Sequence, residues 1–391
     1  METLFFLAVL LVGGLIFARL LGRLRFPDVT GYLIAGIILG PSVLNLIHRQ
    51  GVDSLALVSE VALAFIAFSI GSELKLSNLK KFGNKIIIVT IAEAMGAFII
   101  VFLGCLFLFK TSLALALILA SISCATAPAA TLMVIRQYQA KGELVNVLIP
   151  VVALDDAVCI IAFGVCSSIA QALVSQGDLN LLSMFLSPLW EIILSLSIGA
   201  IFGFLYLYIV KKCRNENEVL AFTLSIIFIA TSLALYLKIS NLLLLMATGM
   251  VVTNLSNNSY RYTQSVEKIT PAIFMAFFVL SGADLDLSVL PSVGLLGLFY
   301  IIGRVIGKIL GSYTSTRFVG FPKSVQNYLG LTLTPQAGVA IGLSSIAIKL
   351  FPGPKGLQIR TIILGATIIY ELAGPLIAKI ALEKAGCIKK A

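Results

Sequence analysis

The chain has 391 residues, of which 59% are hydrophobic and 12% are charged, and its formal net charge is +10. A soluble domain carries roughly 25% charged residues, so this composition excludes an ordinary soluble protein. The basic residues gather in alternate loops between apolar runs, which indicates membrane topology and argues against a nucleic-acid surface.

Apolar runs of the roughly 20 residues needed to cross a bilayer recur from one end of the chain to the other. They predict an all-α polytopic membrane protein with about 13 transmembrane helices. The predicted spans lie near 3–22, 30–47, 55–71, 84–109, 112–135, 143–173, 185–210, 219–237, 240–254, 269–283, 291–316, 324–348 and 358–382. Most Lys and Arg residues follow odd-numbered spans, which predicts an external N-terminus and a cytoplasmic C-terminus.

Short motifs in the first half of the chain return in the second half in the same order. The pairs are Gly71–Ser77 with Gly282–Ser288, Thr126–Ala130 with Thr334–Gly338, and Leu154–Ala157 with Tyr370–Ala373. The members of each pair lie an odd number of spans apart, so the two halves are expected to have opposite orientations in the membrane. Chance matching in apolar sequence is the alternative. The agreement of all three pairs favours an inverted-topology repeat, as transporters use for alternating access.

Two spans carry a proline near their middle. Pro128 lies in the span 112–135, and Pro335, followed by Gln336, lies in the span 324–348. Proline removes a backbone donor and breaks a helix, which lipid tolerates only where protein or a water-filled cavity surrounds the freed groups. A simple kink explains one such proline. Two, in corresponding places of the repeat, predict a pair of crossed broken helices at a binding site.

The span 143–173 contains two adjacent carboxylates, Asp155 and Asp156. A charge at the bilayer centre costs at least about 2.5–3.5 kcal/mol, so intramembrane acids indicate ion or proton binding. Neighbouring helix positions point about 100° apart, so one acid is expected to face a cavity and the other a second helix. The Thr126 hydroxyl, backbone carbonyls at the breaks and Asp156 together offer the oxygen ligands that hard cations prefer.

Other ionisable residues lie at matching depths. Arg304 and Lys308 are four residues apart and share one helix face, so either can pair with the Asp pair. Glu93 lies opposite Arg304 in the repeat. Glu371 lies opposite the Asp pair and is expected to have a structural role, capping a broken helix or pairing with a cation. A fixed buried ion-pair network is the structural alternative for these charges.

These residues resemble a known family, the monovalent cation:proton antiporter family 2, and in particular its NapA-type sodium/proton antiporters. The resemblance rests on ATAPAA at 125–130, ALDDA at 153–157, GRVIGKILG at 303–311 and TPQAGVAIGL at 334–343. It implies that Asp156 carries the cation and the proton, and that Asp155 pairs with Lys308 or Arg304. It also implies electrogenic exchange and a homodimer.

The resemblance further implies two parts that move against each other like an elevator. A dimerisation part holds helices near 3–47 and 219–254, and a core holds those near 56–71, 84–135, 143–173 and 269–382. The span 185–210 links them.

The sequence therefore predicts an antiporter that exchanges Na⁺, or Li⁺, for H⁺ across the cell membrane without a cofactor. Its partners are expected to be monovalent cations, protons and membrane lipid. A K⁺/H⁺ antiporter with the same mechanism is the alternative, followed by a sodium-coupled symporter of organic anions. A channel lacks support because the charges are isolated and form no continuous polar pore. An enzyme lacks support because no nucleophile–base pair is evident.

Overall fold

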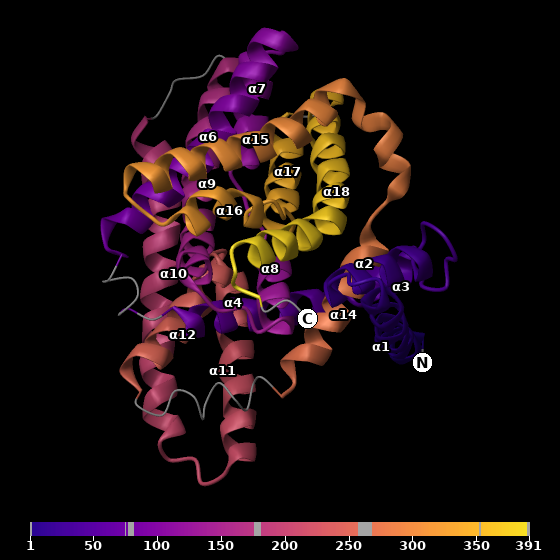
Figure 1. Cartoon of the computed structure of the whole chain (residues 1–391), viewed down its shortest axis with the longest axis vertical. Helices are drawn as coiled ribbons and strands as arrows, with labels where there is room; N and C mark the ends of the chain where they lie inside the picture. Colours follow the sequence, from indigo (N-terminus) through magenta and orange to yellow (C-terminus); the bar gives the residue numbers. More distant parts are fainter. Residues whose placement is uncertain are drawn as a thin grey trace. The chain divides into compact units, whose positions relative to one another are not determined.

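A computed structural model describes residues 2–74, 76, 82–175, 181–256, 268–351 and 353–388. All regular secondary structure in these ranges is helical (Figure 1). The described part contains 8 helices that are long and apolar enough to cross a membrane, together with several shorter apolar helices. The predicted all-α polytopic fold is confirmed. The basic residues Lys75, Lys80, Lys81, Arg261, Lys389 and Lys390, which contributed to the predicted topology, lie outside the described residues.

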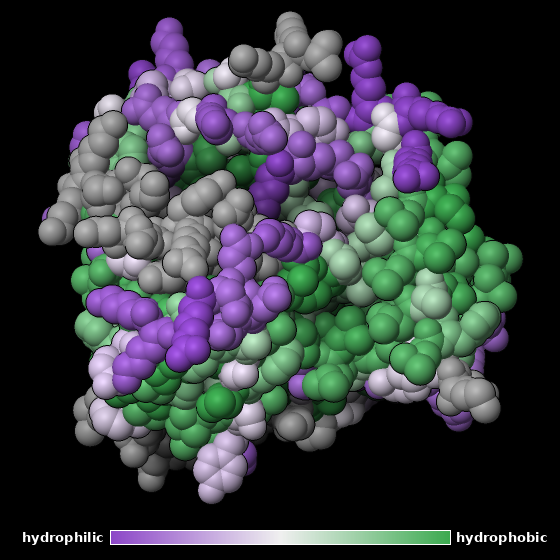
Figure 2. Space-filling model, turned by 90° about the horizontal axis from the view of Figure 1, so that it is seen from below, coloured by the Kyte–Doolittle hydropathy of each residue, from purple (hydrophilic) through white to green (hydrophobic). Residues whose placement is uncertain are grey.

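Many large apolar side chains lie on the surface of the molecule. Phe5, Trp190 and Ile201, for example, are each more than 60% exposed. Figure 2 shows wide areas of apolar residues, with hydrophilic residues gathered in separate bands. Exposed apolar surface of this extent marks contact with a membrane or a partner. Together with the lengths of the helices, it indicates a multi-pass membrane protein.

The chain divides into two compact units. The first comprises Met1–Phe17, Tyr32–Phe82 and Leu189–Asp284. Its helices are α3 (Arg49–Ser54), α4 (Ala56–Glu73), α11 (Glu216–Leu237), α12 (Asn241–Leu255), α14 (Thr270–Asp284) and most of α1 (Glu2–Arg23), α2 (Asp28–Leu39) and α10 (Leu181–Val210). This unit includes α4 and α14, which the resemblance assigns to the core. The functional division into core and dimerisation parts stays a prediction.

Glycines bring two helix pairs of the first unit into backbone contact. Gly71 of α4 lies against the backbone of Met246, and Gly249 of α12 lies against the backbone of α4 in turn. Gly36 of α2 and Gly282 of α14 form an equivalent contact, because each faces backbone atoms of the other's helix. Gly71 and Gly282 occupy corresponding positions of the sequence repeat. Each contact joins a helix of one half of the chain to a helix of the other, and the two contacts occupy corresponding positions, as an inverted repeat requires.

The second unit comprises Ala18–Gly31, Gly83–Pro188 and Leu285–Ala391. Its helices are α6 (Asn84–Leu103), α7 (Leu113–Ser123), α8 (Pro128–Gln137), α9 (Glu143–Ser175), α15 (Gly294–Phe318), α16 (Lys323–Thr332), α17 (Gly338–Leu350) and α18 (Pro354–Lys384). A π-helical turn, η1 (Gly104–Leu108), extends α6, and a 3-10 turn, η2 (Leu287–Val293), precedes α15. All the residues singled out as ion or proton ligands, ion-pair partners or helix breaks lie in this unit.

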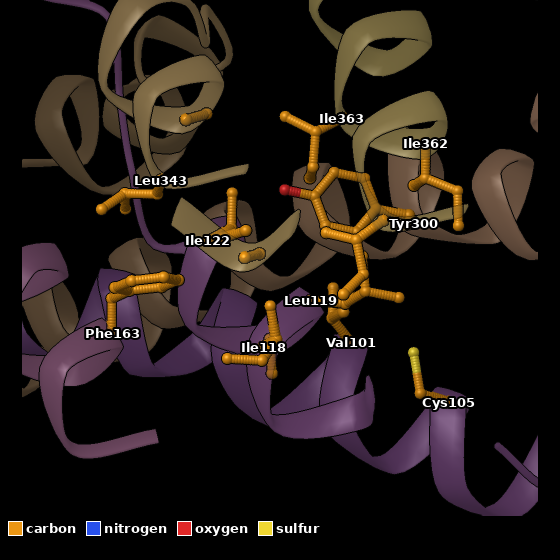
Figure 3. Close-up of a cluster of buried hydrophobic side chains, with 14 of the residues drawn as sticks. Val101, Cys105, Ile118, Leu119, Ile122, Phe163, Tyr300, Leu343, Ile362 and Ile363 are labelled. Carbon is orange, nitrogen blue, oxygen red and sulfur yellow. The ribbon is translucent and has the colours of Figure 1, made fainter. Parts of the chain in front are cut away.

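Buried apolar side chains hold the helices of this unit together. Figure 3 shows Ile118 and Leu119 of α7 close to Val101 of α6, with Tyr300 of α15 and Ile363 of α18 on the other side of the cluster. These side chains are almost completely buried. The cluster fixes α7, α15 and α18 next to the points where two spans are interrupted.

Both predicted breaks are present. The helix α7 ends at Ser123, and α8 begins at Pro128, whose fixed φ suits the first helical position. The second break separates α16, which ends at Thr332, from α17, which begins at Gly338. The two breaks touch, because Ala127 N donates a hydrogen bond to Pro335 O at 2.9 Å. The crossed broken helices of the predicted fold are confirmed.

Two predicted spans differ from the observed helices at their ends. The helix α2 stops at Leu39, well before the predicted end near residue 47, because Gly40 and Pro41 follow. The residue before a proline avoids the helical conformation, so the helix does not continue. The predicted span 291–316 starts as a 3-10 turn around Pro291, and α15 begins at Gly294 with φ +64°.

Candidate functional site

The site is built around two cations of α15, Arg304 and Lys308. They lie one helical turn apart, and both are completely buried. Glycines on the same helix let α6 approach closely, since Gly307 lies against Ala97 and Gly96, and Gly311 lies against the Cα of Glu93. Gly96 faces Gly307 reciprocally. This contact sets the register of the two helices and brings Glu93 opposite the cations.

Arg304 binds backbone carbonyls of both breaks. Its Nε donates to Ser123 O at 3.0 Å, while its Nη1 donates to Thr334 O at 2.7 Å and its Nη2 to Ala125 O at 2.6 Å. Its guanidinium lies over the ring of Tyr370, 4.7 Å from the centroid. Interrupted helices leave carbonyls without intrahelical donors, and a guanidinium offers five N–H groups to satisfy them. Arg304 therefore joins the two breaks through hydrogen bonds and has no ion pair in the described structure.

Lys308 is held by carboxylates. Its Nζ lies 3.2 Å from Asp155 Oδ2 and 2.7 Å from Glu93 Oε2, and it donates to Cys124 O at 2.6 Å. Of the two basic residues that the sequence offered as partners of Asp155, the described structure brings Lys308 to it. The proximity of Glu93 was not predicted. The signal was present in the sequence, because Gly96 and Gly307 stand three residues after Glu93 and Arg304 in the two matched spans.

Asp156 forms no ion pair with this cluster of charges among the described residues. It is 2% exposed, and its Oδ1 has no hydrogen-bond partner among the described residues. Thr126, in the first break, is equally buried, and its hydroxyl also has no partner. Asp155 contacts an ammonium, whereas Asp156 forms no ion pair in the described structure, as expected for neighbours on different faces of a helix.

Side chains near the breaks connect them to the surrounding helices. Gln336 Nε2 donates to Ile122 O at 2.9 Å, and the Gln336 amide also contacts the Tyr300 hydroxyl. Thr131 of α8 donates to Thr332 O at 3.0 Å. The sequence placed Pro128, Pro335 and Gln336 at the breaks but gave no indication that Tyr300 would contact Gln336, because an isolated tyrosine in an apolar span has no pattern.

Glu371 lies near the second break but contacts no cation. It is 4% exposed, and its Oε2 has no partner among the described residues. Gly374, three residues further along α18, packs against Pro335. The hydroxyl of Thr367, one turn earlier, is buried and unpartnered as well. The ion pair that the sequence offered as one role for Glu371 is not formed within the described residues.

Comparison with known proteins identifies relatives of similar length. The family described as "Sodium/hydrogen exchanger, transmembrane" matches residues 7–384. The high-affinity Na⁺/H⁺ antiporter NhaS3 of Synechocystis sp. is 23% identical over 83% of this chain and 78% of its own. The Na⁺/H⁺-K⁺ antiporter GerN of Bacillus cereus is 24% identical over 88% and 89%. A solved structure, the sodium proton antiporter MjNhaP1 from Methanocaldococcus jannaschii, has the same fold, with a TM-score of 0.78, 17% identity and 99% coverage of both chains.

Proposed function

Because the chain belongs to the family of transmembrane sodium/hydrogen exchangers, we propose that it exchanges Na⁺ for protons across the cell membrane and that both ions compete for Asp156. The observation that carries this proposal is a carboxylate buried within a membrane helix, with one oxygen that has no hydrogen-bond partner among the described residues. A charge in that position needs a proton or a cation to offset it. One carboxylate serves one of them at a time, so binding of either ion releases the other.

The Asp156 carboxylate and a hydroxyl of the first break offer oxygen ligands that suit a hard cation. The Thr126 hydroxyl, in the break between α7 and α8, is buried and has no hydrogen-bond partner among the described residues. Na⁺ and Li⁺ prefer such oxygen ligands. The neighbouring Asp155 takes the other role, because its carboxylate lies beside the Lys308 ammonium. On this proposal Asp156 is the carrier, and Asp155 is the residue that ties α9 to α15.

Alternating access follows from the same architecture. Broken helices that cross in the membrane and corresponding contacts in the two halves are typical of transporters that expose one site to each side in turn. We propose an elevator-like movement of the core against a dimerisation part in a homodimer, with the N-terminus outside and the C-terminus in the cytoplasm.

Potassium is the second candidate substrate. The relative GerN is described as a Na⁺/H⁺-K⁺ antiporter, and it aligns with most of this chain. A K⁺/H⁺ antiporter would use the same carboxylate and the same competition. A sodium-coupled symporter of organic anions has less support, because buried acids beside a buried cation favour proton exchange.

Transport in proteoliposomes tests the proposal. The purified protein is reconstituted, a pH gradient is imposed, and the internal pH is followed while Na⁺, Li⁺ or K⁺ is added. Dissipation of the gradient by Na⁺ or Li⁺ in wild type, and its loss in Asp156→Asn, is the expected result. Glu60→Gln, which removes an exposed carboxylate of α4, is the matched control and should transport normally.

Each other outcome has a definite meaning. A response to K⁺ alone would keep the mechanism and change the substrate. Exchange by Asp156→Asn at the wild-type rate would remove Asp156 from the role of carrier. No response to any of the cations would favour the symporter.

A further inference from the structure

Lys308 has two carboxylate neighbours on two different helices. Glu93 of α6 is completely buried, and its Oε2 lies 2.7 Å from Lys308 Nζ, closer than the 3.2 Å to Asp155 Oδ2. The glycine contacts between α6 and α15 hold this geometry, since Gly311 lies directly against the Cα of Glu93. The Lys308 ammonium thus lies closer to the carboxylate of α6 than to that of α9, while its hydrogen bonds to a carboxylate go to Asp155.

The charges of this cluster do not balance. Two carboxylates face one ammonium, so neutralising either acid leaves a balanced pair of one carboxylate and one ammonium. Arg304, one turn before Lys308 on the same helix, is occupied by backbone carbonyls. Breaking a buried pair by removing its only partner is strongly destabilising, because an uncompensated charge remains. With two acids present, Asp155 can leave Lys308 without that penalty.

We propose that Glu93 is a positioning residue that holds the Lys308 ammonium, protonated and in place, during the part of the cycle in which Asp155 does not hold it. The inference rests on the proposed function, since it concerns the carboxylate next to the carrier Asp156. On this proposal carboxyl groups carry the exchanged protons, and Lys308 does not. Lys308 keeps its three N–H bonds throughout, because Glu93 remains beside it.

A double-mutant cycle of thermal stability tests whether Glu93 and Asp155 both stabilise the Lys308 ammonium. Thermal unfolding of the purified protein is measured for wild type, Glu93→Gln, Asp155→Asn and the double variant, each with and without Lys308→Gln. The single acid substitutions should lower the melting temperature moderately. The double variant should lose more than the sum of both, because Lys308 is then unpaired. In that background alone, Lys308→Gln should raise the melting temperature.

Glu371→Gln is the matched control, since it also removes a buried carboxylate but one that forms no ion pair among the described residues. Its combination with Asp155→Asn should give additive losses. Additive losses for Glu93→Gln with Asp155→Asn, or a further fall on adding Lys308→Gln to the double variant, would overturn the shared pairing.

A second measurement separates positioning from simple structural support. Protons released per Na⁺ bound are counted with a pH indicator in weakly buffered detergent solution. In Glu93→Gln, Lys308 loses its second partner, so an N–H proton should leave for water when the cation draws Asp155 away. The ratio should therefore rise, and Glu93→Asp should restore it. An unchanged ratio in Glu93→Gln would contradict the proposal.

The two proposals fail in different ways. If wild type binds Na⁺ without releasing any proton, the proposed exchange at Asp156 is wrong, and the assignment of Glu93 to the transport cycle is wrong with it. The stability cycle does not depend on transport, so it still decides whether Glu93 and Asp155 share Lys308.

Discussion

Arg304 and Lys308 stand one turn apart on the same helix and both donate to carbonyls of the first break, yet only Lys308 has carboxylate neighbours. Arg304 is bound by carbonyls of both helix breaks, whereas Lys308 is bound mainly by the carboxylates of Glu93 and Asp155. A carbonyl keeps its partial charge, but a carboxylate gains and loses a full charge as it binds protons. The guanidinium is therefore a fixed connection between the broken helices, and the ammonium belongs to the group of residues whose charges change.

The largest effect is expected where Arg304 is removed. Arg304→Ala leaves buried carbonyls in both breaks without donors, and each costs about 1–3 kcal/mol, so the protein should lose at least about 3 kcal/mol of stability. Arg304→Lys should recover only part of this loss, because three donors on a flexible stem replace a planar fork. Thermal unfolding in detergent measures both. A full recovery by Lys would show that Arg304 acts through its charge alone.

Adding a side chain at the contact between α6 and α15 should displace α15, and with it both Arg304 and Lys308. In Gly307→Ala the added methyl would lie 2.5 Å from Ala97 Cα, so the helices must separate, at a cost of about 1–3 kcal/mol. Gly303→Ala is the control, because a methyl there would first meet the Phe299 side chain at 3.3 Å. Comparable losses of stability and transport in the two variants would show that α6 and α15 are not in closest contact at Gly307.

Coupling to Asp155 should distinguish the two cations directly. Lys308→Ala should cost less stability in an Asp155→Asn background than in wild type, with a coupling of about 1 kcal/mol, kept small by the presence of Glu93. Arg304→Ala should cost the same in both backgrounds. Double-mutant cycles from thermal or chemical unfolding measure the two couplings. Equal coupling of both residues to Asp155 would remove the distinction between them.

The smallest effect is expected at Glu371. This carboxylate has no cation partner in the described structure, so Glu371→Gln removes an uncompensated charge and keeps the shape of the side chain. Stability should change by less than about 1 kcal/mol, in contrast to the acids around Lys308. A large loss would mean that Glu371 has a charged partner that matters for folding, and unfolding measurements of the single variant decide this.

The fold was largely accessible from sequence because membrane helices are long, apolar and bounded by charged loops. The breaks were accessible because Pro128 and Pro335 interrupt apolar spans at matched positions of the repeat. The predicted end of the second span near residue 47 was wrong, because hydrophobicity continues past Pro41 while the helix does not.

The pairing of the charged residues was less accessible. The sequence offered Arg304 and Lys308 as equal partners of Asp155, since both lie on one helix face. Their different environments depend on which residues the neighbouring helices place opposite them, and this depends on the contact of Gly96 with Gly307. Repeat matching placed Glu93 opposite Arg304 in sequence, but only the packing brings it to Lys308. The contacts of Tyr300 with Gln336 and of Tyr370 with Arg304 left no signal, because aromatic residues are common in membrane helices.

The central claim is that one carboxylate, Asp156, binds either the cation or the proton. The most direct test is the affinity of the purified protein for Na⁺, measured by calorimetry at a series of pH values. Competition with one proton predicts that the dissociation constant rises about tenfold for each unit by which the pH falls in the acidic range. Asp156→Asn should show no measurable binding at any pH. A Na⁺ affinity that does not change with pH, or binding retained by Asp156→Asn, would contradict the account.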